Sequence, residues 1–181
     1  MNWYDEVKLN LKKKRAILFS KSSECLLPLQ SQLEDTDKRT AVLWSLYFAE
    51  DAVELVSARY PDESAPCDAL ALTKLWAQGK VKMPEAKRAI LECHALTKRI
   101  SSHEDIALCH AIGQACGCVH AKGHAIGYPV YELTAIVRRY GIEACKDAIE
   151  RRLGEYREEL LELNSSRLAD KYEWAKFLKS N

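Results

Sequence analysis

The chain has 181 residues with 27 basic and 26 acidic side chains, a formal net charge of +1, and a hydrophobic fraction of 48%. This length buries a sizeable core in one compact domain without disulfides or metals. The longest uncharged run, residues 106–121, holds two histidines and is too short for a membrane span, which excludes a transmembrane helix there. The charge is uneven: residues 34–63 carry eight acidic against three basic side chains, so this region disfavours nucleic acid as a partner.

The cysteines indicate a reducing compartment. There are seven of them, an odd number, and several lie inside helical patterns. No basic leader followed by an apolar stretch opens the sequence. We therefore expect reduced thiols in a cytoplasmic protein.

Residues 1–32 predict two N-terminal helices. Residues 3–19 repeat apolar side chains at helical spacing. Their basic run, residues 12–15, is typical of a solvated helix face rather than of a nucleic-acid or lipid site. Residues 22–33 predict a second helix, whose length Pro28 limits.

The strongest helix signal begins at one of two N-cap candidates, Asp35 and Asp37. Its apolar positions continue at helical spacing to Arg59, and Pro61 stops the helix soon afterwards. Trp44 lies within it and is predicted to anchor the core.

Prolines and a glycine mark the next two helices. Pro66 opens a helix that continues through a second core anchor, Trp76, and Gly79 terminates it. Pro84 opens another helix with one apolar and one basic face. This helix stops near Ser101, so we expect it and the helix that follows to be antiparallel neighbours.

Residues 105–127 hold three of the five histidines and four of the seven glycines. Because no formal charge occurs between residues 106 and 121, we predict a buried central helix over about residues 104–121. Advancing by about 100° per residue places small residues on one narrow stripe, where another helix would come close. The stripe consists of Cys109, Gly113, Cys116 and His120, with Gly117 beside it, and His120 is predicted to lie in a tight, dry contact.

The last part of the chain also reads as helical. Pro129 begins a helix that ends at Tyr140, residues 142–163 form a helix of dense mixed charge, and residues 168–178 form a final amphipathic segment. No stretch reads as a strand. The fold class is therefore all-α: a single domain over residues 1–181, a multi-helix bundle of about eight or nine helices around the central helix.

His120 and His124 have HxxxH spacing, which on one helix can place two imidazoles on a metal, with Cys116 one turn earlier. However, the pattern lacks the glutamate of HExxH, and Gly123 is expected to break the helix before His124. The favoured interpretation is a structural, hydrogen-bonded histidine pair with no metal and no cofactor.

Catalysis has little support in the sequence. A cysteine beside a histidine supplies a nucleophile and its base, but no recognisable loop exposes these thiols, and no GxSxG, GxxxxGK[ST] or GxGxxG occurs. We expect no catalytic residue. The residues that would form either a buried polar cluster or a ligand or metal site are His94, His110, Gln114, Cys116, His120 and His124.

A series of short motifs occurs in one order over residues 33–137. They are Asp37-Lys38-Arg39-Thr40 with Leu43-Trp44, Ala49-Glu50, Tyr60-Pro61-Asp62, Leu75-Trp76-Ala77 with Gly79, Cys93-His94-Ala95, Gly113-Gln114-Ala115, and His120 with His124-Ala125. In this order they resemble the immunity proteins of bacterial polymorphic toxin systems. The chain departs from the family's pattern at Lys38, where a histidine is expected, and at Ala65 and Cys67, where arginines flank the proline.

The resemblance implies a small cytoplasmic protein that binds a cognate toxin and blocks it without chemistry of its own. The acidic residues 34–63 fit this role, since they would cover the basic active-site cleft of a nuclease toxin and steer its capture. A solvated acidic face is the plainer interpretation of the same residues. The candidates for partner binding are Glu50, Asp51, Glu54, Asp62 and Glu63.

Two alternatives stay open. One is a small helical metal-binding protein or enzyme with a histidine and cysteine site on the central helix, which metal analysis and substitution of His120 would reveal. The other is a homo-oligomer through the C-terminal helices, whose mass would fall on deletion of residues 168–181. Neither nucleic acid nor a membrane is expected as a partner.

Overall fold

Helices form all the regular structure of residues 2–179, the part of the chain that the computed structural model describes. Eight of these helices have nine or more residues, which confirms the predicted all-α fold. The long helices are α1 (Trp3–Lys12), α2 (Leu27–Asp35), α3 (Lys38–Arg59), α4 (Ala65–Ala77), α5 (Met83–Leu96), α6 (His103–Gly117), α7 (Gly127–Tyr140) and α8 (Lys146–Ser166). The short ones are η1 (Glu24–Leu26), η2 (Lys122–His124), α9 (Leu168–Lys171) and α10 (Lys176–Lys179).

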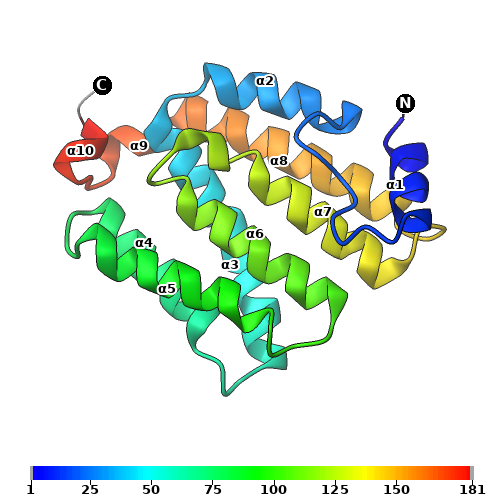
Figure 1. Cartoon of the computed structure of the whole chain (residues 1–181). Helices are drawn as coiled ribbons and strands as arrows, with labels where there is room; N and C mark the ends of the chain where they lie inside the picture. Colours follow the sequence, from blue (N-terminus) through cyan, green and yellow to red (C-terminus); the bar gives the residue numbers. More distant parts are fainter. Residues whose placement is uncertain (1, 180–181) are drawn as a thin grey trace.

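Helix α6 lies at the centre, as predicted. Figure 1 shows it crossing α3, with α4 and α5 on one side and α7 and α8 on the other. Its side chains are buried around most of the helix circumference, and Cys109, Ile112 and Ala115 are fully inaccessible to solvent. Residues 106–117 of α6 carry no formal charge, so no face of this part of the helix requires contact with water, and the helix is buried.

The start of α3 confirms one of the two predicted caps. The Asp37 carboxylate accepts hydrogen bonds from the backbone N–H groups of Arg39 at 2.9 Å and Thr40 at 3.2 Å. These are donors that the first helical turn leaves unpaired. Trp44 is fully buried in this helix, and its Nε1 donates to the backbone carbonyl of Tyr156 in α8 at 2.8 Å.

The predicted end of the central helix is wrong. Helix α6 stops at Gly117 rather than near residue 121, and the chain turns into η2. Lys38 Nζ holds this turn by donating to the His120 carbonyl at 3.0 Å, while the His124 ring packs back over Gly117. His120 therefore leaves the stripe of small residues and is exposed instead of lying in a dry contact.

The first helix is also shorter than predicted. Helix α1 ends at Lys12, and Lys14 adopts a left-handed conformation with φ of 54°. The chain then continues without a helix so that Leu18 reaches the core, where its N–H donates to Thr134 Oγ1 at 3.1 Å.

Helix α8 begins at Lys146, several residues later than predicted, because turns occupy residues 142–144. The C-terminal segment then folds back onto α4. Phe177 stacks on Trp76 with ring centroids 5.6 Å apart, and the Ala175 N–H donates to the Ala77 carbonyl at 2.8 Å. A large part of the predicted amphipathic surface thus packs within its own chain.

Candidate functional site

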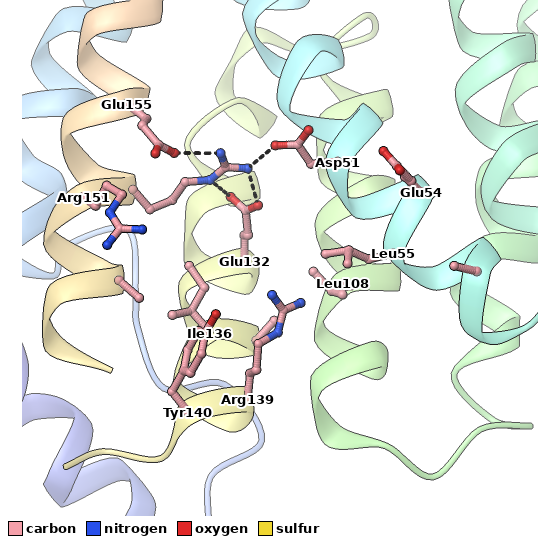
Figure 2. A pocket seen from close by; sticks show the side chains of 14 residues that line it. Asp51, Glu54, Leu55, Leu108, Glu132, Ile136, Arg139, Tyr140, Arg151 and Glu155 are labelled. Carbon is pink, nitrogen blue, oxygen red and sulfur yellow. Dashed lines mark hydrogen bonds and ion pairs between the residues drawn. The ribbon is translucent and has the colours of Figure 1, made fainter. Parts of the chain in front are cut away.

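A single arginine of α8 joins three helices. Arg152 Nη2 lies 2.6 Å from Glu132 Oε1 of α7 and 2.9 Å from Asp51 Oδ2 of α3, and its Nη1 lies 2.9 Å from Glu155 Oε2. Figure 2 shows the three labelled carboxylates converging on this guanidinium group. The guanidinium also lies over the ring of Phe48, 4.7 Å from its centroid. Asp51 and Arg152 are 101 positions apart in sequence, so this contact joins two distant parts of the chain, α3 and α8.

Burial makes this network a structural unit. The Glu132 side chain is 7% exposed and that of Arg152 is 15% exposed. Burial lowers the pKa of Arg152, but hydrogen bonds and the charge of Glu132 outweigh it, so the pKa is raised and the group stays charged. The Tyr156 hydroxyl donates to Glu132, and burial together with that carboxylate raises the Tyr156 pKa. Arg152 therefore stays charged and the Tyr156 hydroxyl stays protonated near neutral pH.

A groove with a predominantly acidic lining runs beside this network. One hollow of about 470 Å³ lies among α3, α7 and α8, and a second of about 350 Å³ lies between α3 and α8. Both are lined by Asp51, Arg152 and Glu155, so the two hollows adjoin, and we name them together the acidic groove. Its carboxylates are Asp51, Glu54, Glu132, Glu155, Glu158, Glu159 and Glu162, and its arginines are Arg139, Arg151 and Arg152.

The acidic groove keeps an excess of negative charge. The charge of Arg139 is balanced by Glu104, a residue that does not line the groove, because Arg139 Nη2 lies 2.6 Å from the Glu104 carboxylate. On α8, burial and the neighbouring charge of Glu162 raise the pKa of Glu159, as expected where carboxylates crowd together. Such a surface attracts cationic side chains.

An exposed tyrosine lines each hollow. Tyr47 and Tyr140 are both 51% exposed. Figure 2 shows Tyr140 at the other end of the larger hollow from Asp51 and Glu155. Tyrosine is enriched in protein–protein interfaces, where its ring supplies contact area and its hydroxyl a hydrogen bond. The groove therefore combines charge with large exposed rings.

The structure brings only two of the five predicted partner-binding residues into the acidic groove. Asp51 and Glu54 line it. Glu50, although adjacent in sequence, turns toward α4 and pairs with Lys74 at 2.5 Å. One turn of α3 thus divides its carboxylates between two surfaces.

The other two predicted residues lie in the turn after α3. Glu63 forms an ion pair with Arg99 at 2.5 Å, and Asp62 is exposed beside it. Neither lines the acidic groove. The acidic stretch 34–63 is therefore continuous in sequence but does not form one surface.

The sequence interpretation missed most of the groove. Its remaining exposed or half-buried carboxylates come from α8, which reads in the sequence only as dense mixed charge. Their spacing gives a usable signal, since positions i, i+3, i+4 and i+7 share one helix face. These residues are Glu155, Glu158, Glu159 and Glu162.

The predicted histidine cluster forms two separate pairs. His94 Nδ1 and His110 Nδ1 share a hydrogen bond of 3.0 Å, and Gln114 Oε1 accepts one of 3.0 Å from His124 Nδ1. Burial lowers the pKa of all three histidines. Cys116 belongs to neither pair, because its Sγ donates to a backbone carbonyl of α4 at 3.6 Å.

Burial keeps two cysteine thiols of the central region protonated. All seven cysteines are free thiols. Burial raises the pKa of Cys116 to about 12 and that of Cys118 to about 11, so both stay protonated. Residues 2–179 contain no group of three or more histidine, cysteine, aspartate or glutamate side chains arranged to hold a metal ion.

Comparison with known protein families gives a match over much of the chain. A family model described as "Imm-5 like putative immunity protein" matches residues 31–159, which is most of the chain. No curated protein and no solved structure matches the sequence. Among the helices described, none is both long enough and apolar enough to cross a membrane.

Proposed function

Because the chain belongs to the Imm-5 like immunity protein family, we propose that it binds and neutralises a cognate toxin of a bacterial polymorphic toxin system. The observation that carries this proposal is the match over residues 31–159, which spans α3 to α7 and most of α8. The protein acts by covering a surface of the toxin and performs no chemistry itself. A cytoplasmic location, where such a toxin would act, is part of the same proposal.

The acidic groove is the proposed contact surface. Its excess of carboxylates suits a basic element of the partner, such as the active-site region of a nuclease. Tyr47 and Tyr140 supply rings that pack against such an element. Attraction between opposite charges speeds association and weakens as salt increases.

Rigidity of the groove supports this role. Arg152 of α8 contacts carboxylates of α3 and α7, and its pair with Glu132 is mostly buried, so the exposed carboxylates stand on helices that are packed together before binding. A surface ordered before binding loses less conformational freedom when it binds. The central pair of the network, Arg152 and Glu132, is thus mostly buried, whereas Glu158 and Glu162 remain exposed.

Growth rescue tests the proposed function. The toxin-like domain encoded beside this chain is expressed with the wild-type protein, with Glu158→Lys/Glu162→Lys, or with the control Glu92→Lys/Glu173→Lys. All four positions are exposed, so both pairs change the surface charge equally and leave the core intact. The control also loses the ion pair of Glu173 with Lys80, at 3.7 Å, which is exposed and adds little stability. We expect wild type and control to restore growth, and the groove variant to fail.

The two failures are distinguishable. Loss of rescue by wild type, with a toxin shown to be active, contradicts the immunity function. Full rescue by the groove variant contradicts only the acidic groove as the contact surface.

Deletion of residues 168–181 separately tests the proposed oligomer through the C-terminal helices. If these helices hold the oligomer together, light scattering should give a multimeric mass for the wild-type protein and a lower mass for the deletion variant.

A further inference from the structure

A third hollow, of about 270 Å³, lies on the α5 side of α6. Four apolar side chains, Trp76, Met83, Ile90 and Leu91, form much of its wall. Its polar and glycine lining consists of Lys87, His94, Gly113, Gln114, Gly117, His120 and His124. We name it the histidine groove; the proposed toxin contact does not use it.

Glycines make room for the polar side chains. A Cβ at Gly113 would overlap the ring of His94, and one at Gly127 would overlap Gln114 Oε1. A Cβ at Gly117 would lie 3.1 Å from His124 Cγ, closer than ordinary contact. The imidazoles and the amide therefore pack directly against helix backbone.

Hydrogen bonds orient the two imidazoles that line the groove. His124 Nδ1 carries a proton and donates to Gln114 Oε1, so its Nε2 is the nitrogen left for another partner. His94 Nδ1 is bonded to His110 Nδ1, so the two uncharged rings must be opposite tautomers. His94 Nε2 then lies over Gly113, within the lining of the groove.

The lysines near these rings, Lys21 and Lys87, supply positive charge. The groups that act on His94 are His110 and His124, and those that act on His124 are Lys21 and His120. Lys87 of α5 is exposed at the groove. The described residues that line the groove include no aspartate and no glutamate.

We propose that the histidine groove is a binding site for a small monocarboxylate with an apolar body. The apolar walls hold the body, while His124 Nε2 and Lys87 face the carboxylate. The volume lies just below the usual range of small-molecule sites, about 300 to 1,000 Å³, so the ligand is small. An acetate-sized anion leaves the walls uncovered, and a neutral ligand leaves the positive charge unpaired.

Binding involves proton uptake at one nitrogen. In the free protein His124 is uncharged near neutral pH, since burial and then Lys21 and His120 lower its pKa. When the carboxylate enters, a proton from solvent binds Nε2 of His124, and the imidazolium donates it as a hydrogen bond to the carboxylate oxygen. No covalent bond forms, and the complex gains one proton.

Titration calorimetry with benzoate tests the site. Benzamide has the same ring without the charge, and acetate has the charge without the ring. We expect benzoate to bind one per chain, about fiftyfold more tightly at pH about 6 than at pH about 8, because uptake of nearly one proton changes the affinity by close to tenfold per pH unit until the free His124 begins to titrate. Two buffers of different ionisation enthalpy should report uptake of nearly one proton at the higher pH, and benzamide and acetate should each bind about tenfold more weakly.

Variants assign the effect to the groove. His124→Gln removes the titrating group and should flatten the pH dependence, whereas His103→Gln at the exposed start of α6 should leave it unchanged. Lys87→Gln, on the surface, should weaken benzoate about threefold without disturbing the fold.

Three outcomes overturn the proposal. Benzoate does not bind the wild-type protein, benzamide binds as tightly as benzoate, or His124→Gln keeps the full pH dependence. If benzoate fails and Lys87→Gln weakens toxin binding instead, the occupant is a protein segment and the small-molecule assignment is wrong.

Discussion

Substitution of Arg152 by methionine should destabilise the fold strongly. Methionine keeps an apolar stem but leaves the Glu132 carboxylate, 7% exposed, without its counterion. Removing one partner of a buried pair costs about 3–5 kcal/mol in the free energy of unfolding. The contacts to Asp51 and Glu155 add little, because those side chains are 59% and 44% exposed.

A double variant separates lost charge balance from lost packing. Arg152→Met/Glu132→Gln removes both charges, while the glutamine oxygen still accepts the hydrogen bond from Tyr156. We expect it to recover most of the loss and to lie about 1–2 kcal/mol below wild type. Arg151→Met, at the exposed neighbouring position, should stay within about 0.5 kcal/mol of wild type.

Urea denaturation followed by circular dichroism and tryptophan fluorescence provides the measurement. The midpoints give the differences in unfolding free energy, and an unchanged slope shows that the native state stays equally compact. The reasoning is refuted if Arg152→Met behaves like Arg151→Met, or if the double variant is as unstable as Arg152→Met alone.

Two further predictions concern the glycines and histidines. Gly113→Ala should lower the unfolding free energy by about 1–3 kcal/mol because its Cβ would overlap His94. Gly154→Ala, in the middle of α8 with open space around it, should raise the unfolding free energy by about 0.5–1 kcal/mol. Urea midpoints that shift in the same direction for both variants contradict this. Burial lowers the pKa of His94 and His110 below the ordinary 6.5, so the folded state favours their uncharged forms. Their contribution to the stability of the fold is complete above pH 6.5 and is lost as the pH falls below 6.5 and through the pKa of the folded state. The thermal midpoint of His110→Gln should therefore decline less steeply than that of wild type as the pH is lowered, and an equally steep decline contradicts this.

Local signals predicted most of the helices because their causes are local. The cap at Asp37 begins α3, and Pro66 and Pro84 lie in the first turns of α4 and α5. The buried centre was equally predictable, since an uncharged α6 has no face that prefers water. These features depend on residues within a few positions of one another.

The predictions that failed depended on distant contacts. Helix α6 ends early because Lys38 and His124 stabilise the turn that follows Gly117. The spacing of apolar residues along the helix does not predict those contacts. The acidic groove was only partly found, because its carboxylates come from α3, α7 and α8. Glu54 and Glu155 share it only through the packing of these helices.

The most direct test of the central claim is the association rate of the purified cognate toxin at low and high salt. For Glu158→Lys/Glu162→Lys we predict an association rate about tenfold below wild type at low salt, with a weaker dependence on salt. Glu92→Lys/Glu173→Lys should match wild type under both conditions. A groove variant that keeps the wild-type rate and salt dependence would contradict capture of the toxin by the acidic groove.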